Sequence, residues 1–124
     1  MTFSRILQDI VDNCGGGIGA ALMGTDGIPI AQFVTGSVPE GPLSEDIGTA
    51  GVEFNRILDE IRKASDGLAG GAMVETVVVL ARFSLAFRPV DDDAYLVVVV
   101  APDGNLGKAR YLLRTQLHAL RALF

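Results

Sequence analysis

The chain has 124 residues, of which 49% are hydrophobic and 20% are charged. This balance predicts one globular domain over residues 1–124 and excludes a disordered segment. The formal net charge of −5 argues against a nucleic-acid partner, because phosphate binding needs a clustered basic excess. The longest apolar run, residues 95–101, is too short to span a membrane, so we expect no membrane partner either.

The N-terminus and the cysteine content favour a cytoplasmic location. No small-residue cleavage site follows Met1, and Asp9 and Asp12 come soon after it, so we expect no signal peptide. Cys14 is the single cysteine and cannot form a disulfide within the chain, which fits a reducing compartment. It lies on an apolar helical stripe and is expected to be a buried, inert thiol.

The first third of the chain predicts a helix followed by a β-hairpin. Apolar residues recur with helical spacing over residues 3–14, and Gly15–Gly17 end the pattern. Two apolar runs, residues 18–23 and 28–33, then flank an Asp26-Gly27 turn that requires positive φ. Pro29 has no N–H, so the second strand should begin late or lie at a sheet edge.

The middle of the chain predicts one long helix. Ser44 is the expected N-cap, the pattern is helical to Ser65, and Asp66-Gly67 is expected to close the helix. The expected buried stripe consists of Ile47, Gly51, Phe54, Leu58 and Ile61, widened by Ile57.

The last third predicts three strands and a final helix. The strands are expected at residues 73–80, 84–90 and 95–101, with turns near residues 81–83 and 91–93. The third of them is the most apolar and should be central and buried on both faces. Asn105 is the expected cap of a helix whose inward residues are Leu106, Ala109, Leu113, Leu117, Leu120 and Phe124.

The elements add up to the order αββαβββα, an α+β domain with a five-stranded, mostly antiparallel sheet and three helices. The sequence offers no catalytic set within this frame. His118 has no second histidine to join it in a metal site, and the glycines near Cys14 run from helix to strand, whereas phosphate-binding loops run from strand to helix. The stretch from Gly104 to Lys108 lacks the full phosphate-loop spacing. We therefore predict a protein without cofactor, metal or enzymatic activity.

The end of the chain is locally basic. No acidic residue follows Asp103, whereas Lys108, Arg110, Arg114 and Arg121 do. The two interpretations are a docking surface for an acidic partner or membrane, and a solvated helix face. The solvated face is the simpler one.

Two features call for an explanation beyond a monomer core. The middle helix opens with Gly48, Ala50 and Gly51, small residues that permit close approach either of a second helix or of the chain's own sheet. The strand at residues 73–80 is rich in valine and is expected at the edge of the sheet. Such an edge favours aggregation unless another chain pairs with it, and a second subunit would do so.

The chain resembles the Roadblock (dynein light-chain) family, and in particular its bacterial MglB-like members. The resemblance covers essentially all residues. It rests mainly on the strand Tyr95–Val100 followed by Asn105-Leu106-Gly107-Lys108-Ala109-Arg110, similar to the family's last strand and the start of its final helix. The hairpin of residues 19–27 is also similar to the family's first two strands.

The resemblance implies a Roadblock/profilin-like fold and a dimer with a continuous ten-stranded sheet. It implies that the paired middle helices form a face that binds a Ras-like small GTPase in polarity or motility control. Other members are adaptors, so the alternative is a scaffold that heterodimerises with another Roadblock protein without contacting a GTPase. The implied contact residues are Gly48, Ala50, Gly51, Phe54 and Asn55 for the helix, and Val74, Thr76 and Val78 for strand pairing.

Two departures from the family pattern bear on this expectation. The stretch Glu53-Phe54-Asn55-Arg56 adds bulk and charge where family members often carry alanine, so the GTPase-facing surface is expected to differ. The sequence ends at Phe124, and we expect no function that depends on a C-terminal tail. Gly51→Arg and Val78→Asp are the substitutions expected to convert the dimer into a monomer.

Overall fold

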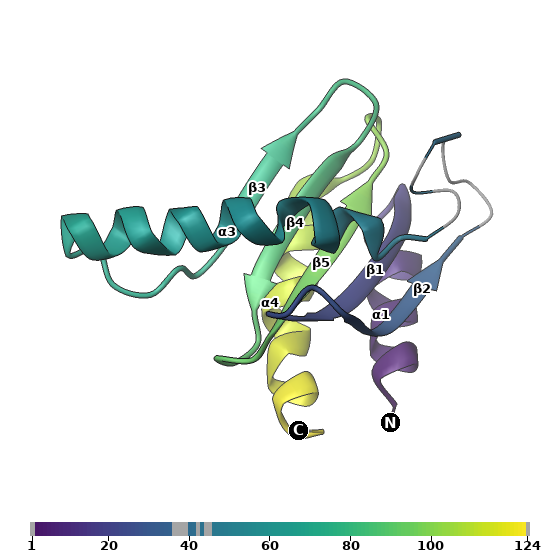
Figure 1. The fold of residues 1–124 in the computed structure, drawn as a ribbon. Helices are drawn as coiled ribbons and strands as arrows, with labels where there is room; N and C mark the ends of the chain where they lie inside the picture. The colour runs from purple at the N-terminus through teal and green to yellow at the C-terminus, as the bar shows by residue number, and fades with distance from the viewer. Residues whose placement is uncertain (1, 36–39, 42, 44–45, 124) are drawn as a thin grey trace.

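The computed structural model describes residues 2–35, 40–41, 43 and 46–123. Over these residues it contains a five-stranded sheet with helices on both faces (Figure 1). The predicted order of helices and strands is confirmed. The elements are α1 (Phe3–Asn13), β1 (Gly17–Gly24), β2 (Pro29–Val34), α3 (Thr49–Leu68), β3 (Thr76–Val79), β4 (Ser84–Pro89), β5 (Ala94–Val100) and α4 (Leu106–Arg121).

The sheet has the strand order β2-β1-β5-β4-β3, and each neighbouring pair is antiparallel. β5 is the central strand and is buried along its whole length, as predicted. β2 lies at one edge, which fits the missing N–H of Pro29. β3 lies at the opposite edge, also as predicted, so β3 is hydrogen-bonded on one side to β4.

The core has two layers, one on each face of the sheet. α1 and α4 cover one face, and α3 crosses the other (Figure 1). Alternate residues of β5 supply both layers, because successive side chains of a strand point to opposite faces. Leu96 and Val98 pack toward α1 and α4, whereas Tyr95, Val97 and Val99 pack toward α3.

The expected helix ends and turns are confirmed in most places. The Asn105 side chain accepts a hydrogen bond from the Lys108 N–H at 2.9 Å, as expected of a cap, and at α1 the Thr2 hydroxyl accepts one from the Arg5 N–H at 3.2 Å. Gly15 and Gly16 follow α1 with φ of 75° and 80°, a conformation in which a side chain would be strained. Cys14 is buried, and loss of solvation raises the pKa of its thiol. His118 is exposed.

The middle helix differs from the prediction at both ends. Ser44, the expected N-cap, lies outside the described residues, but residues 46–48 are not helical and α3 begins at Thr49, with Gly48 as its N-cap. It does not close at Asp66-Gly67 but continues to Leu68, where Ala69 takes the left-handed conformation with φ of 53°. The Gly70 N–H donates to the Ser65 carbonyl at 2.9 Å, which satisfies one of the last carbonyls of the helix.

The strand expected at residues 73–80 is shorter than predicted, because β3 covers only Thr76–Val79. The register pairs Thr76 with Phe87, and by extension places Val74 opposite Pro89. In this ladder that position requires an N–H, which proline lacks. Pro89 on β4 therefore ends β3.

Candidate interaction surface

The open edge of β3 has backbone groups that point away from the sheet. The Leu80 N–H donates to the Phe83 carbonyl at 3.0 Å, which makes these two residues a hydrogen-bonded pair. Hydrogen-bonded and non-bonded pairs alternate along an antiparallel ladder, so Val78 and Thr76 bond to β4. The backbone N–H and C=O groups of Val77 and Val79 therefore point toward the open edge.

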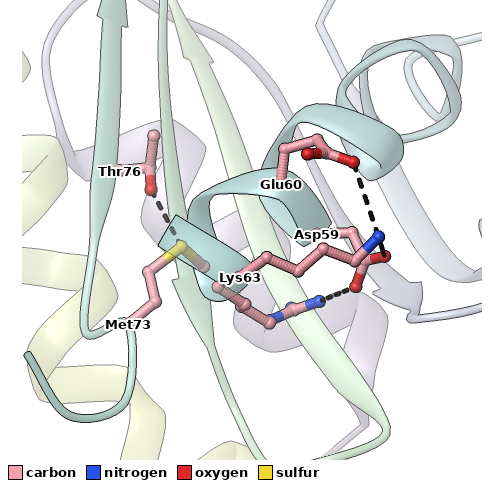
Figure 2. Close-up of polar contacts among 6 residues, drawn as sticks. Asp59, Glu60, Lys63, Met73 and Thr76 are labelled. Atoms are coloured by element: carbon pink, nitrogen blue, oxygen red, sulfur yellow. Dashed lines mark hydrogen bonds and ion pairs between the residues drawn. The ribbon is translucent and has the colours of Figure 1, made fainter. Parts of the chain in front are cut away.

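The side chains of this edge divide between the two faces of the sheet. Thr76 and Val78, two of the predicted pairing residues, are half-buried and pair with Phe87 and Leu85, whose side chains lie on the α3 face. The Thr76 hydroxyl donates to the sulfur of Met73 at 3.0 Å (Figure 2). Val74, the third predicted residue, precedes the strand and is 62% exposed, and Val79 is 71% exposed.

The small residues at the start of α3 pack on the chain's own sheet. A Cβ on Gly51 would stand 2.5 Å from Cε of Met23, and a Cβ on Gly48 would stand 2.7 Å from Cγ of Pro29. Ala50 is also buried. The small residues therefore allow α3 to approach the chain's own strands closely. This is one of the two explanations that the sequence left open.

Three aromatic side chains fix α3 on the sheet. The Phe54 and Phe87 ring centroids are 5.2 Å apart, and those of Phe87 and Tyr95 are 6.2 Å apart. The buried Tyr95 hydroxyl donates to the Gly51 carbonyl at 3.0 Å. The side chain of Asn55, another predicted contact residue, is half-buried with its amide nitrogen near the turn at Gly27. Gly51 and Phe54 thus anchor the helix within the chain.

This anchor predicts a specific loss of stability at high pH. Loss of solvation raises the pKa of Tyr95 to about 12 from its ordinary 10.0. A pKa raised in the folded state means that the unfolded chain loses its proton first, so stability present below pH 10 is lost as the pH rises to 12. Two pKa units correspond to about 2.7 kcal/mol.

The measurement is urea unfolding, followed by circular dichroism, at intervals between pH 9 and 12. In the Tyr95→Phe variant, the free energy of unfolding should no longer fall by this amount between pH 10 and 12. Tyr111→Phe, at an exposed tyrosine, is the control and should show the same decline as the parent protein. Equal pH dependence in the two variants would contradict the assignment to Tyr95.

The second half of α3 projects beyond the strands past the β3 edge (Figure 1). After Leu58 no residue of this helix is buried. Asp59 lies 3.7 Å from Arg62 and 3.9 Å from Lys63, and Lys63 also lies 3.5 Å from Glu60 (Figure 2). Such pairs within one helix each stabilise it by only about 0.2–0.5 kcal/mol. Ile61 is partly buried against the core layer beneath α3, and the other described residues of this half contribute no buried side chain.

Ile57 lies near the middle of α3, one residue before the buried Leu58. It was expected to widen the buried stripe but is 44% exposed. Leu68 is 82% exposed, and both side chains lie on one side of α3, together with Ala64, at helical spacing. We call these three residues the apolar stripe; Ile57 and Leu68 leave much of its surface uncovered in the single chain.

An apolar hollow of about 420 Å³ lies between the first half of α3 and the β3–β4 turn. Its lining is mainly hydrophobic and includes Leu43, Ala50, Phe54, Leu80, Phe83 and Leu85. Glu53 also lines it, and Glu53 lies on the same side of α3 as Ile57. The hollow, the apolar stripe and the open β3 edge therefore form one surface. The sequence did not predict the hollow, and it did not identify Val77 and Val79 as part of this surface.

Solved structures show the family of this chain. The chain is 31% identical to MglC from Myxococcus xanthus, with all of both chains covered and a TM-score of 0.70. The chain belongs to the Roadblock/LC7 family. A Roadblock/LC7 domain from Streptomyces avermitilis has the same fold at 15% identity, with a TM-score of 0.83 over 99% of this chain and 98% of that one. The gliding protein MglB from Thermus thermophilus is similar at 19% identity, with a TM-score of 0.81 over 95% and 84%.

No protein-family model matches the sequence, and no curated protein does. The resemblance and the fold class predicted from the sequence are confirmed by the solved structures. In this Roadblock chain, the described residues contain no group of three or more histidine, cysteine or acidic side chains arranged to hold a metal ion. No helix within them is long and apolar enough to cross a membrane.

Proposed function

We propose that this Roadblock chain is a dimeric, non-enzymatic interaction module of the cytoplasm. Two copies join through their β3 edges, antiparallel, so that the sheet continues over ten strands. The observation that supports this proposal most directly is the open β3 edge, where the backbone groups of Val77 and Val79 point away from β4 and have no strand beside them among the described residues. Such an edge promotes aggregation unless it is covered, and pairing with a second copy covers it.

The projecting half of α3 supports the same arrangement. A two-fold axis beside β3 places the second copy's α3 antiparallel to the first and above the first copy's sheet. The apolar stripe of Ile57, Ala64 and Leu68 then lies next to the apolar hollow of the other copy. The exposed apolar side chains of each α3 are thus covered by the other copy.

The remaining outward side of α3 is the proposed site for a Ras-like small GTPase. Val52, 56% exposed, and Arg56 lie there, opposite the residues that face the sheet. The relation to MglC from Myxococcus xanthus and the likeness to a gliding protein support a role in motility or polarity. This site follows from the dimer, because two α3 helices side by side make the binding face.

The test is a pull-down with a bacterial Ras-like GTPase loaded with a non-hydrolysable GTP analogue or with GDP. We expect binding to at least one nucleotide state, and we expect Val52→Glu to weaken it by about tenfold or more, the usual cost of placing a charge in an apolar contact. Val34→Glu is the matched control, because Val34 is 46% exposed on β2, at the opposite edge of the sheet. Absence of binding in both states, or equal loss in both variants, would contradict the GTPase proposal.

Whether the module also stimulates GTP hydrolysis can be tested separately by substituting Arg56. It is the single basic residue in the first three turns of α3 and is exposed, as an arginine finger needs to be. If the module activates the GTPase by ordering its switch loops, Arg56→Ala keeps the single-turnover rate. A fall of about a thousandfold would identify Arg56 as a finger.

The alternative function is an adaptor that pairs with another Roadblock chain and contacts no GTPase. The same β3 edge supports it, because the exposed backbone groups do not distinguish one Roadblock chain from another. Native mass spectrometry of this chain mixed with a second Roadblock protein separates the two cases. A mixed dimer together with a failed pull-down favours the adaptor, and separate homodimers contradict it.

A further inference from the structure

A second candidate surface lies on the sheet face opposite α3, beside α4. A shallow hollow of about 200 Å³ opens between α4, β4 and the segment that leads into β3. Its lining consists of Glu75, Arg88, Gly107, Arg110, Tyr111 and Arg114. Three guanidinium groups therefore face one carboxylate. We call this site the α4 hollow.

The single carboxylate of the α4 hollow fixes two of its arginines. Glu75 has a side-chain exposure of 17% and accepts hydrogen bonds from Arg88, at 3.0 Å, and from Arg110. Arg88 is only 14% exposed, so this pair is held in place by its surroundings. A guanidinium has five N–H donors, and the bonds to Glu75 leave donors of both arginines for a further acceptor.

The third arginine has a different environment. The Arg114 guanidinium lies 5.5 Å from the centroid of the Tyr111 ring, which is a cation–π distance. Among residues 2–35, 40–41, 43 and 46–123, no carboxylate forms an ion pair with it. Tyr111 is 53% exposed, so the ring and the guanidinium present a joint surface to solvent. Arginine and tyrosine are the residue types enriched in the energetically dominant parts of protein interfaces.

The charge distribution identifies the kind of partner. α4 carries Lys108, Arg110, Arg114 and Arg121 and no acidic residue, although the whole chain has a net charge of −5. An acidic protein as a whole is repelled by extended polyanions such as nucleic acid or an anionic membrane. A local basic surface with an exposed aromatic ring instead complements a short acidic segment with some apolar side chains.

We propose that the α4 hollow binds an acidic segment of a partner protein. A carboxylate of that segment accepts hydrogen bonds from Arg110 and Arg114, and an apolar neighbour packs on Tyr111. The hollow is contained in one chain and does not depend on the dimer. If the dimer forms as proposed above, the two hollows lie on the same face of the continuous sheet, opposite the paired α3 helices, and two partners can be held on separate faces.

The experiment measures fluorescence anisotropy of a fluorescein-labelled nine-residue peptide made of three Glu-Glu-Leu repeats. The matched probe replaces each glutamate by glutamine. We expect the acidic peptide to bind at low salt, the glutamine peptide to bind at least about tenfold more weakly, and added salt to weaken the acidic peptide. Arg114→Gln should reduce affinity about tenfold, because it removes a charge-assisted hydrogen bond.

The controls separate this proposal from folding defects and from the proposed function. Arg56→Gln, on α3, should leave peptide binding unchanged, and circular dichroism should show that Arg114→Gln is folded. A monomeric protein that still binds the peptide would overturn the dimer and support the α4 hollow. Equal binding of both peptides, or full binding by Arg114→Gln, would overturn the α4 hollow. A protein that sediments with phosphatidylserine vesicles but does not bind the acidic peptide would also overturn the α4 hollow, because the partner would then be a membrane.

Discussion

The Val77→Pro variant is expected to keep the fold of the parent protein and to dimerise much more weakly. The Val77 N–H points away from β4, so proline removes a donor that the chain itself does not use. In a two-fold dimer the loss occurs twice. At about 1–1.5 kcal/mol for each hydrogen bond, the dissociation constant should rise roughly a hundredfold.

Sedimentation over a wide range of protein concentrations measures the change. Val78→Pro is the matched control, because the neighbouring N–H bonds to β4 and its removal should destabilise the monomer itself. A Val77→Pro protein that dimerises as tightly as the parent would show that the β3 edge is not the contact. A parent protein that is monomeric at high concentration would contradict the dimer altogether.

Gly51→Arg is expected to destabilise the single chain rather than to test the dimer. Even a Cβ on Gly51 would stand 2.5 Å from Cε of Met23, and a longer side chain would displace α3 from the sheet. The hydrogen bond from Tyr95 to the Gly51 carbonyl would be lost with it. Overpacking and a buried charge together should lower the free energy of unfolding by more than about 3 kcal/mol.

Urea unfolding followed by circular dichroism checks this, and α3 supplies its own control. A Cβ on Gly67 meets nothing within 4 Å. Gly67→Arg puts the same side chain on the same helix and should be neutral or stabilising by up to about 1 kcal/mol, because arginine is the better helix former. Similar stabilities for the two variants would mean that α3 is not seated on Met23.

Local signals predicted most of the fold. Helical spacing, the glycines after α1, the Asp26-Gly27 turn and the Asn105 cap act over a few residues and can be recognised in the sequence. The length of β3 could not be predicted in this way, because Pro89 ends it from the neighbouring strand. The exposure of Ile57 also depends on tertiary structure, because the sheet covers only the side of α3 that carries its neighbour Leu58.

The candidate site was predicted as a region but not residue by residue. Small residues in a helix indicate a close neighbour without identifying it, and for Gly51 the neighbour is Met23. The sequence also indicated a valine-rich edge but not its register. The positions that direct backbone groups outward, Val77 and Val79, follow only once the Leu80–Phe83 hydrogen bond fixes the phase of the ladder.

The sheet ends in two different strands, and this difference limits how large an assembly can grow. Pairing β3 with β3 is self-complementary and stops at two copies, whereas pairing β3 with β2 would leave a free strand at each end and extend into a filament. β2 is poorly suited to that second contact: it begins with Pro29, and its register to β1 shifts between Leu22 and Met23. The interrupted strand thus protects the protein against open-ended polymerisation.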